Sequence, residues 1–170
     1  CLGEPVEFYR LPIPLDRDAL CRDLLRQFTE SVTAQLGNKK AEDFVSQIGE
    51  QTGAQIDMYY RAALKSLNLT REEVGAALVD LKRRIEGDFY IIEQTEEKIV
   101  LGNRACPFGS KVLDRPALCM MTSSVFGSIA SSNLGYAKVS LEKTIARRDK
   151  ECRVVVYLRE AAEAEQAEGR

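Results

Sequence analysis

The stretch that decides the fold is residues 106–152, CPFGSKVLDRPALCMMTSSVFGSIASSNLGYAKVSLEKTIARRDKEC, which holds three of the five cysteines. Pro116 favours the first turn of a helix, and the apolar spacing continues that helix to about residue 133. Its Ser, Gly and Ala residues make it thin enough to pack closely against a neighbour. Segments 136–145 and 152–158 flank a charged turn and predict a β-hairpin. In the second of these strands Cys152, Val154 and Val156 share one face.

The residues before this stretch predict three helices and another hairpin. Apolar residues at helical spacing indicate helices from Asp16 or Asp18 to about residue 36 and from about 41 to 66. Thr70 and Glu73 form a capping box that begins a third helix. Segments 88–94 and 98–101 then predict the hairpin. The order predicts an α+β domain, an antiparallel sheet with the helices packed on one face.

The second predicted helix carries a G-x-x-x-G spacing at Gly49 and Gly53. We expect close approach of another helix or of a ligand there, because a glycine has no side chain to hold a neighbour away. The apolar spacing predicts a different set as the inward face: Phe44, Ile48, Ile56, Tyr60, Ala63 and Leu64.

Composition limits the classes of function. The chain has 170 residues with 24 basic and 26 acidic side chains, which fits one domain (residues 1–158) followed by a helical linker or tail (residues 159–170). The charges are interleaved, so we expect no nucleic-acid partner. No apolar run reaches the roughly 18 residues of a membrane span. An odd cysteine count without a C-x-x-C pair favours reduced thiols and a cytoplasmic location. Cys1 is either the start of a fragment or a lipid-modified terminus.

The cysteines after residue 100 form a candidate thiolate metal site. Cys106 begins a tight turn whose amides at Phe108 and Gly109 are expected to point back at the sulfur. Cys119 lies in the first turn of a helix, where the helix dipole lowers a thiol pKa. If Cys152 pairs nearby, the three sulfurs suit Zn²⁺, with Glu142 as the first choice for a fourth ligand. They suit an iron–sulfur cluster equally, and three buried core cysteines, or surface thiols, remain the plain alternative.

Over residues 20–158, and most densely after Cys106, the sequence resembles the methanogen output domain family of prokaryotic signalling proteins. It is more distantly similar to vinyl-4-reductase-type domains, which implies an α+β fold, frequent dimers, and an apolar ligand pocket beside a zinc site of cysteines and a glutamate. On that resemblance Cys119, Glu142 and Cys152 match zinc ligands. Ile145 stands where a further cysteine is expected, and Cys106 is the candidate replacement.

These features predict a non-enzymatic sensory domain that binds a small apolar ligand and relays to a fused or partner signalling domain, as a homodimer. The predicted ligand pocket is lined by Phe89, Tyr60, Met121 and Phe126. Two alternatives stay open. One is an enzyme that uses a metal-bound water or a cysteine nucleophile, although the chain has no histidine to serve as base. The other is a structural interaction module stapled by its site.

Overall fold

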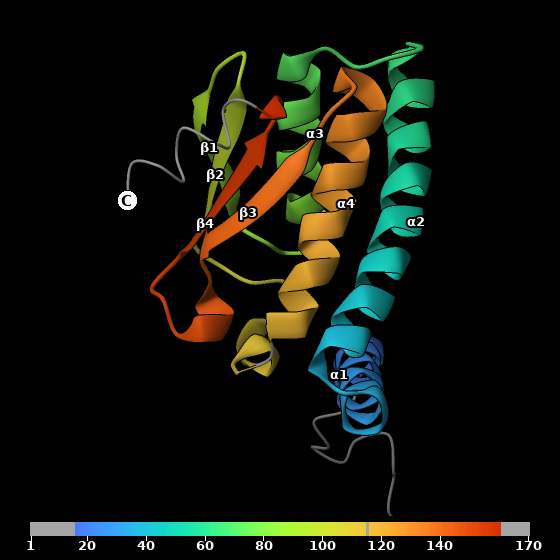
Figure 1. Ribbon diagram of the computed structural model, residues 1–170, viewed down its shortest axis with the longest axis vertical. Helices are drawn as coiled ribbons and strands as arrows, with labels where there is room; N and C mark the ends of the chain where they lie inside the picture. The colour runs from blue at the N-terminus through green and yellow to red at the C-terminus, as the bar shows by residue number, and fades with distance from the viewer. Residues whose placement is uncertain (1–15, 115, 161–170) are drawn as a thin grey trace, which may run out of the picture.

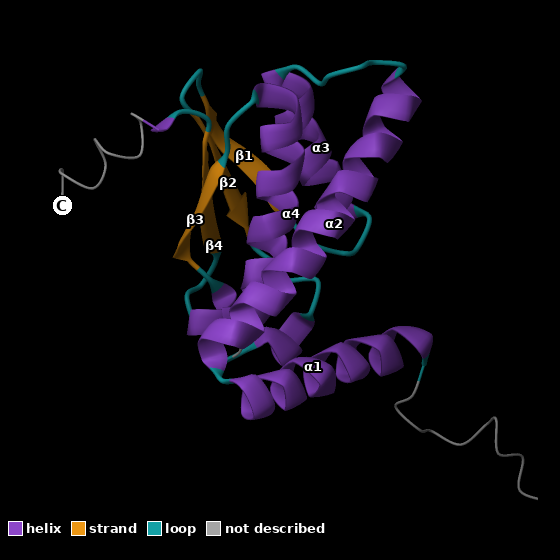
Figure 2. Cartoon of the chain, turned by 45° about the vertical axis from the view of Figure 1, so that its right-hand side comes forward, coloured by secondary structure: helices purple, strands orange, loops and turns teal. Residues whose placement is uncertain are grey.

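The computed structural model describes residues 16–114 and 116–160, so Cys1 and most of the predicted tail lie outside the described residues. It has four α-helices and a four-stranded sheet in the described part of the chain, and the helices lie on one side of the sheet (Figures 1 and 2). The elements in order are α1 (Arg17–Leu36), α2 (Asn38–Leu64), α3 (Arg71–Arg83), β1 (Phe89–Gln94), β2 (Lys98–Asn103), the 3₁₀ turn η2 (Gly109–Val112), α4 (Pro116–Leu134), β3 (Lys138–Lys143), the 3₁₀ turn η3 (Ile145–Arg147) and β4 (Cys152–Tyr157). The predicted α+β fold class is confirmed.

The sheet joins the two predicted hairpins through their second strands. Its order is β1-β2-β4-β3, and every neighbouring pair is antiparallel. The register sets Asn103 opposite both Phe89 on β1 and Cys152 on β4. The end of β2, the start of β1 and the start of β4 therefore lie together at one end of the sheet.

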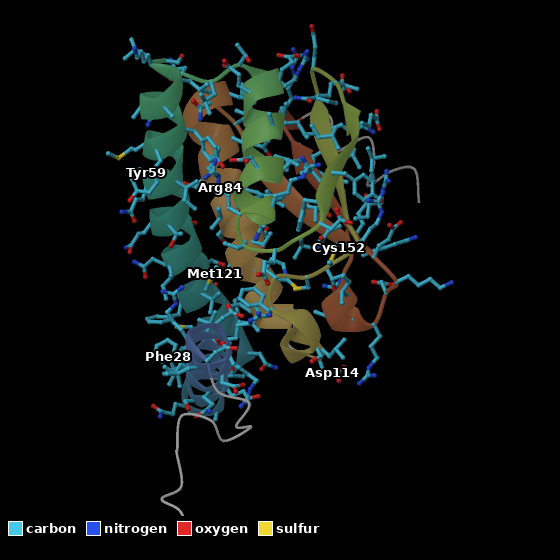
Figure 3. All side chains as sticks on the ribbon, turned by 180° about the vertical axis from the view of Figure 1, so that it is seen from behind. Phe28, Tyr59, Arg84, Asp114, Met121 and Cys152 are labelled. Carbon is cyan, nitrogen blue, oxygen red and sulfur yellow. The ribbon has the colours of Figure 1, made fainter. Side chains whose placement is uncertain are left out.

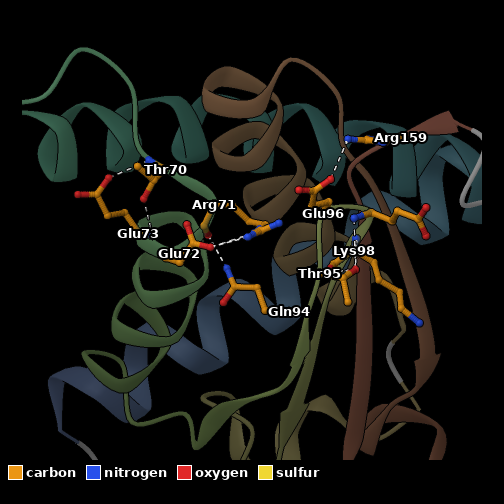
Figure 4. A network of polar contacts seen from close by, with 10 residues as sticks. Thr70, Arg71, Glu72, Glu73, Gln94, Thr95, Glu96, Lys98 and Arg159 are labelled. Atoms are coloured by element: carbon orange, nitrogen blue, oxygen red, sulfur yellow. Dashed lines mark hydrogen bonds and ion pairs between the residues drawn. The ribbon is translucent and has the colours of Figure 1, made fainter.

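Local capping fixes where the helices begin. The Asp16 side chain accepts a hydrogen bond of 2.8 Å from the Ala19 amide at the start of α1. Thr70 and Glu73 form the predicted capping box of α3, which Figure 4 shows beside the first hairpin. In the same view Gln94 donates to the Arg71 carbonyl at 2.6 Å, so the start of α3 is bonded to the end of β1.

The two glycines of α2 are the point where α2 and α4 meet. A Cβ added at Gly49 would lie 2.7 Å from the Ser124 Cβ, and one added at Gly53 would lie 2.7 Å from the Ser128 Cβ. The buried residues of α2 follow this line: Ala41, Val45, Gly49, Gly53 and Asp57. The predicted inward face of α2 was wrong for Phe44 and Leu64, which are exposed, and was confirmed for Ile56 and Tyr60, which pack against the hydrophobic core. Small residues, which hydrophobic spacing overlooks, let the two backbones approach.

The main core lies between the sheet and the helices α3 and α4. Its largest fully buried side chains include Phe126, Leu78, Ile99, Leu101 and Ile129. By contrast, α1 runs across the end of the helical layer (Figure 2) and buries only Thr29 among its residues. None of the helices in the described ranges is both long and apolar enough to cross a membrane.

Candidate functional site

Three separate segments bring cysteines to the end of the sheet described above. Cys152 begins β4, Cys106 lies in the loop that follows β2, and Cys119 lies in the first turns of α4. In Figure 3 the labelled Cys152 lies at the end of the sheet next to η3. All three cysteines, which are free thiols, line one pocket.

We call this space the inner pocket. Its walls are almost entirely apolar, and its free volume is about 30 Å³. That is the volume of roughly one water molecule. Its lining residues are Phe89, Asn103, Cys106, Pro107, Phe108, Val112, Leu118, Cys119, Thr122, Leu141, Thr144, Cys152 and Val154.

Backbone and amide N–H groups point at two of the sulfurs. The Ile145 amide donates to the Cys152 sulfur at 3.4 Å, and the Asn103 side chain donates to the same sulfur at 3.7 Å. The Phe108 amide donates to Cys106 and lowers the pKa of its thiol. The Gly109 amide, expected to do the same, instead donates to the Cys106 carbonyl at 2.9 Å. Such N–H···S contacts stabilise the negative charge of a thiolate.

Burial dominates the pKa of two of the thiols, Cys119 and Cys106. Removal from water raises the pKa of Cys119 to about 12, with the neighbouring sulfurs of Cys106 and Cys152 adding to the shift. Burial likewise raises the pKa of Cys106. The pKa lowering predicted for Cys119 at its helix start was therefore wrong, because desolvation exceeds the helix dipole. Cys119 is a neutral thiol at neutral pH unless a cation stabilises its thiolate.

A buried lysine stands behind the inner pocket, and the sequence analysis missed it. Lys82 of α3 is 5% exposed. Its Nζ donates to the Thr122 hydroxyl at 2.8 Å and lies 5.7 Å from the ring centre of Phe89. Both Thr122 and Phe89 line the inner pocket. Lys82 occupies an inward position of an amphipathic helix next to Leu81, and that pattern was the one signal that could have revealed it.

The predicted fourth ligand lies elsewhere. Glu142 accepts a hydrogen bond of 2.9 Å from Arg153 and is not among the residues that line the inner pocket. Across residues 16–114 and 116–160, no group of three or more His, Cys, Asp or Glu side chains is arranged to hold a metal ion. The three sulfurs thus surround one small cavity but would have to move inward to ligate one ion.

Of the four residues of the predicted ligand pocket, Phe89 and Phe126 are buried in the main core and Tyr60 packs against it. Phe89 lines the inner pocket and packs edge-on against Phe126, with 5.6 Å between ring centres. Tyr60 lies on α2, where its hydroxyl donates to Asp80 at 2.6 Å. Met121, labelled in Figure 3, has its backbone carbonyl against Gly49 in the seam between α2 and α4.

A second pocket adjoins the inner one. This outer pocket has a free volume of about 150 Å³ and is lined by Glu42, Cys119, Met120, Leu141, Thr144 and Arg147. It shares Cys119, Leu141 and Thr144 with the inner pocket. A cavity of this size accommodates a benzene-sized molecule. Cys119 therefore stands between a space the size of one ion and a space the size of a small organic ligand.

The chain was compared with curated sequences, solved structures and protein families. No match was found among curated protein sequences. Among solved structures, the crystal structure of the phenol-responsive sensory domain of the transcription activator PoxR with phenol has a TM-score of 0.64 at 14% sequence identity. The match covers 91% of this chain and 82% of that one, and at this identity it shows a shared fold. The family described as methanogen output domain 1 matches residues 24–157.

That match spans most of the chain, from the second turn of α1 to the end of β4, and includes all three cysteines of the inner pocket. The family description names an output domain, which agrees with the regulatory class predicted from the sequence. The chain belongs to the methanogen output domain 1 family.

Proposed function

We propose that this domain is a non-enzymatic sensory domain that holds one soft divalent metal ion, Zn²⁺ foremost, at the inner pocket. The observation that carries the proposal is the convergence of Cys106, Cys119 and Cys152 on one small pocket. Three thiolates are a sufficient protein ligand set for Zn²⁺, whose fourth position is then filled by water or a ligand. The ion would supply the positive charge that the buried sulfurs need in order to lose their protons.

The size of the cavity favours a single ion over an iron–sulfur cluster. A free volume of about 30 Å³ accepts one ion after a small inward movement of the sulfurs, whereas several iron and sulfide atoms would have to push the core apart. The raised pKa of Cys119 also speaks against the enzyme alternative with a cysteine nucleophile, because the thiolate is the reactive form.

We further propose that the sensed molecule is a small, mainly apolar compound in the outer pocket. Met120 and Leu141 provide apolar walls there, and Glu42 and Arg147 provide polar groups. A molecule in this space would press on Cys119, which both pockets share, and so change how the inner pocket closes. Because the PoxR domain is described as phenol-responsive, phenol is a reasonable first probe.

The contacts of α1 support a route by which a structural change at the inner pocket reaches the surface of the domain. Arg22 donates to the Pro107 carbonyl at 3.2 Å, next to Cys106. Leu25 packs against the buried cluster of Val112, Leu118 and Ala146, and Cys106 and Cys119 pack against the same cluster. The opposite stripe of α1 leaves Leu20, Leu24 and Phe28 about half exposed. We propose that this stripe meets a second copy or a partner signalling domain and moves with the loop around Cys106.

The test is metal analysis with a visible spectrum on protein purified without oxygen. We expect one zinc per chain and a colourless sample. Cys152→Ser should lose the metal, whereas Cys21→Ser, at an exposed cysteine outside the pocket, should retain it. Metal content near zero in the wild-type protein, or equal content in both variants, would refute the site. Broad absorption near roughly 400 nm would replace zinc by a cluster.

A further inference from the structure

A buried positive charge without a carboxylate partner lies next to the inner pocket, against two of its lining residues, Thr122 and Phe89. Lys82 is 5% exposed, its Nζ bonds to the neutral hydroxyl of Thr122 at 2.8 Å, and it lies 5.4 Å from the ring centre of Phe126. Within the part of the chain that the structure describes, no carboxylate forms an ion pair with Lys82. A buried ammonium group in this condition destabilises a folded domain unless an anion is supplied.

The three thiols are close to Lys82, because Thr122 and Phe89, which it contacts, line the same pocket as the cysteines. The sulfurs of Cys106, Cys119 and Cys152, from the loop after β2, from α4 and from β4, are the groups whose charge acts on it. The aromatic faces of Phe89 and Phe126 supply the remaining electrostatic stabilisation. The Thr122 hydroxyl and the two aromatic rings are weak partners for a buried ammonium group, whereas thiolates that hold a metal ion would be strong ones.

We propose that Lys82 is the built-in counter-charge of a three-thiolate metal site in the inner pocket, an inference that rests on the proposed function. A divalent ion with three thiolates carries one net negative charge, and the ammonium group of Lys82 brings the buried assembly to zero. The three thiol protons leave to solvent as the ion binds. Lys82 is thus a positioning and charge-balancing residue that contacts no metal itself.

This arrangement gives two consequences of opposite sign for the Lys82→Met variant. Without metal, methionine fills nearly the same volume and removes the uncompensated charge, so the metal-free domain should become more stable. With metal, the thiolates lose their counter-charge, so Zn²⁺ affinity should fall by about 10- to 100-fold, the usual size of an outer-shell effect. If Lys82 only supported the fold, the substitution would change the stability of the metal-free domain and the affinity for Zn²⁺ in the same direction.

The experiment measures Zn²⁺ affinity by competition with a chromophoric chelator, and urea unfolding with and without excess chelator. The full chain is compared with Lys82→Met, with Lys82→Gln, which keeps a hydrogen bond to Thr122, and with Lys40→Met, which removes an exposed charge from α2. Both Lys82 variants should bind Zn²⁺ 10- to 100-fold more weakly. Lys82→Met should also unfold at higher urea when metal-free, and Lys40→Met should match the wild type.

Unchanged affinity in both Lys82 variants, with zinc still bound by the wild type, would overturn this inference and leave the proposed function standing. A Lys82→Met protein that is less stable in both states would also overturn it. No zinc binding by the wild-type chain would overturn the proposed function, and the inference with it.

Discussion

Replacement of Gly53 by alanine should lower the free energy of unfolding, because it disturbs the close packing of α2 against α4. The new Cβ would lie 2.7 Å from the Ser128 Cβ and 2.8 Å from the Val125 carbonyl oxygen, whereas carbon atoms in good contact are about 3.5–4.0 Å apart. A backbone carbonyl cannot rotate away, so the two helices must separate. Overpacking of this kind costs about 1–3 kcal/mol. Alanine returns about 1 kcal/mol of helix propensity, and we expect a net loss near 2 kcal/mol, because the obstacle is backbone.

Gly127 of α4 provides the matched control. A Cβ added there meets only the Val139 Cγ2 at 3.6 Å, an ordinary contact, so Gly127→Ala should gain up to about 1 kcal/mol from helix propensity alone. Urea unfolding followed by far-ultraviolet circular dichroism measures both variants. The double variant Gly49→Ala, Gly53→Ala should lose less free energy of unfolding than the two single variants together, since one separation of α2 from α4 relieves both clashes. A Gly53→Ala protein as stable as Gly127→Ala would refute the close seam.

Three further outcomes are expected. Asn133→Ala should lower the free energy of unfolding by about 3 kcal/mol in urea titrations, because it removes the 2.5 Å hydrogen bond to the fully buried carboxylate of Asp57; a loss below 1 kcal/mol would contradict this. Glu142→Gln should leave the zinc content unchanged, since Glu142 is engaged by Arg153 outside the pocket; loss of zinc would restore the predicted fourth ligand. Burial lowers the pKa of Lys82 to about 8. Above that pH the folded domain loses the proton of Lys82 while the unfolded chain still holds it, so the free energy of unfolding of the metal-free wild type should rise with pH. Relative to Lys82→Met the rise should be up to about 1.4 kcal/mol per pH unit. Chemical unfolding at pH 7, 8 and 9 measures this difference, and a constant value would contradict it.

The predictions from sequence succeeded where a short local pattern carries the physics. The start of α3 was predicted from Thr70 and Glu73, and the start of α4 from Pro116, because capping and proline geometry act within one turn. The two hairpins followed from β-branched runs bounded by turns. The glycine spacing at Gly49 and Gly53 predicted a close approach, although it could not say that α4 would be the partner.

Errors arose where burial, which depends on the whole fold, opposes a local rule. The position of Cys119 at a helix start predicts a lowered thiol pKa, yet burial among apolar side chains and two other sulfurs raises it. The apolar spacing of α2 predicted Phe44 on the inward face, whereas the glycine line faces α4 and leaves Phe44 exposed.

The sequence by itself determined the elements, their order and the α+β class, because capping, periodicity and turn chemistry are written within a few residues of each other. Only the tertiary structure decided that Cys106, Cys119 and Cys152 meet at one small cavity, that Lys82 stands behind it, and that Glu142 pairs with Arg153 instead. Those facts depend on strand register and helix packing between segments far apart in the chain. Such long-range distances are set by the sum of many contacts, which no single stretch of sequence contains.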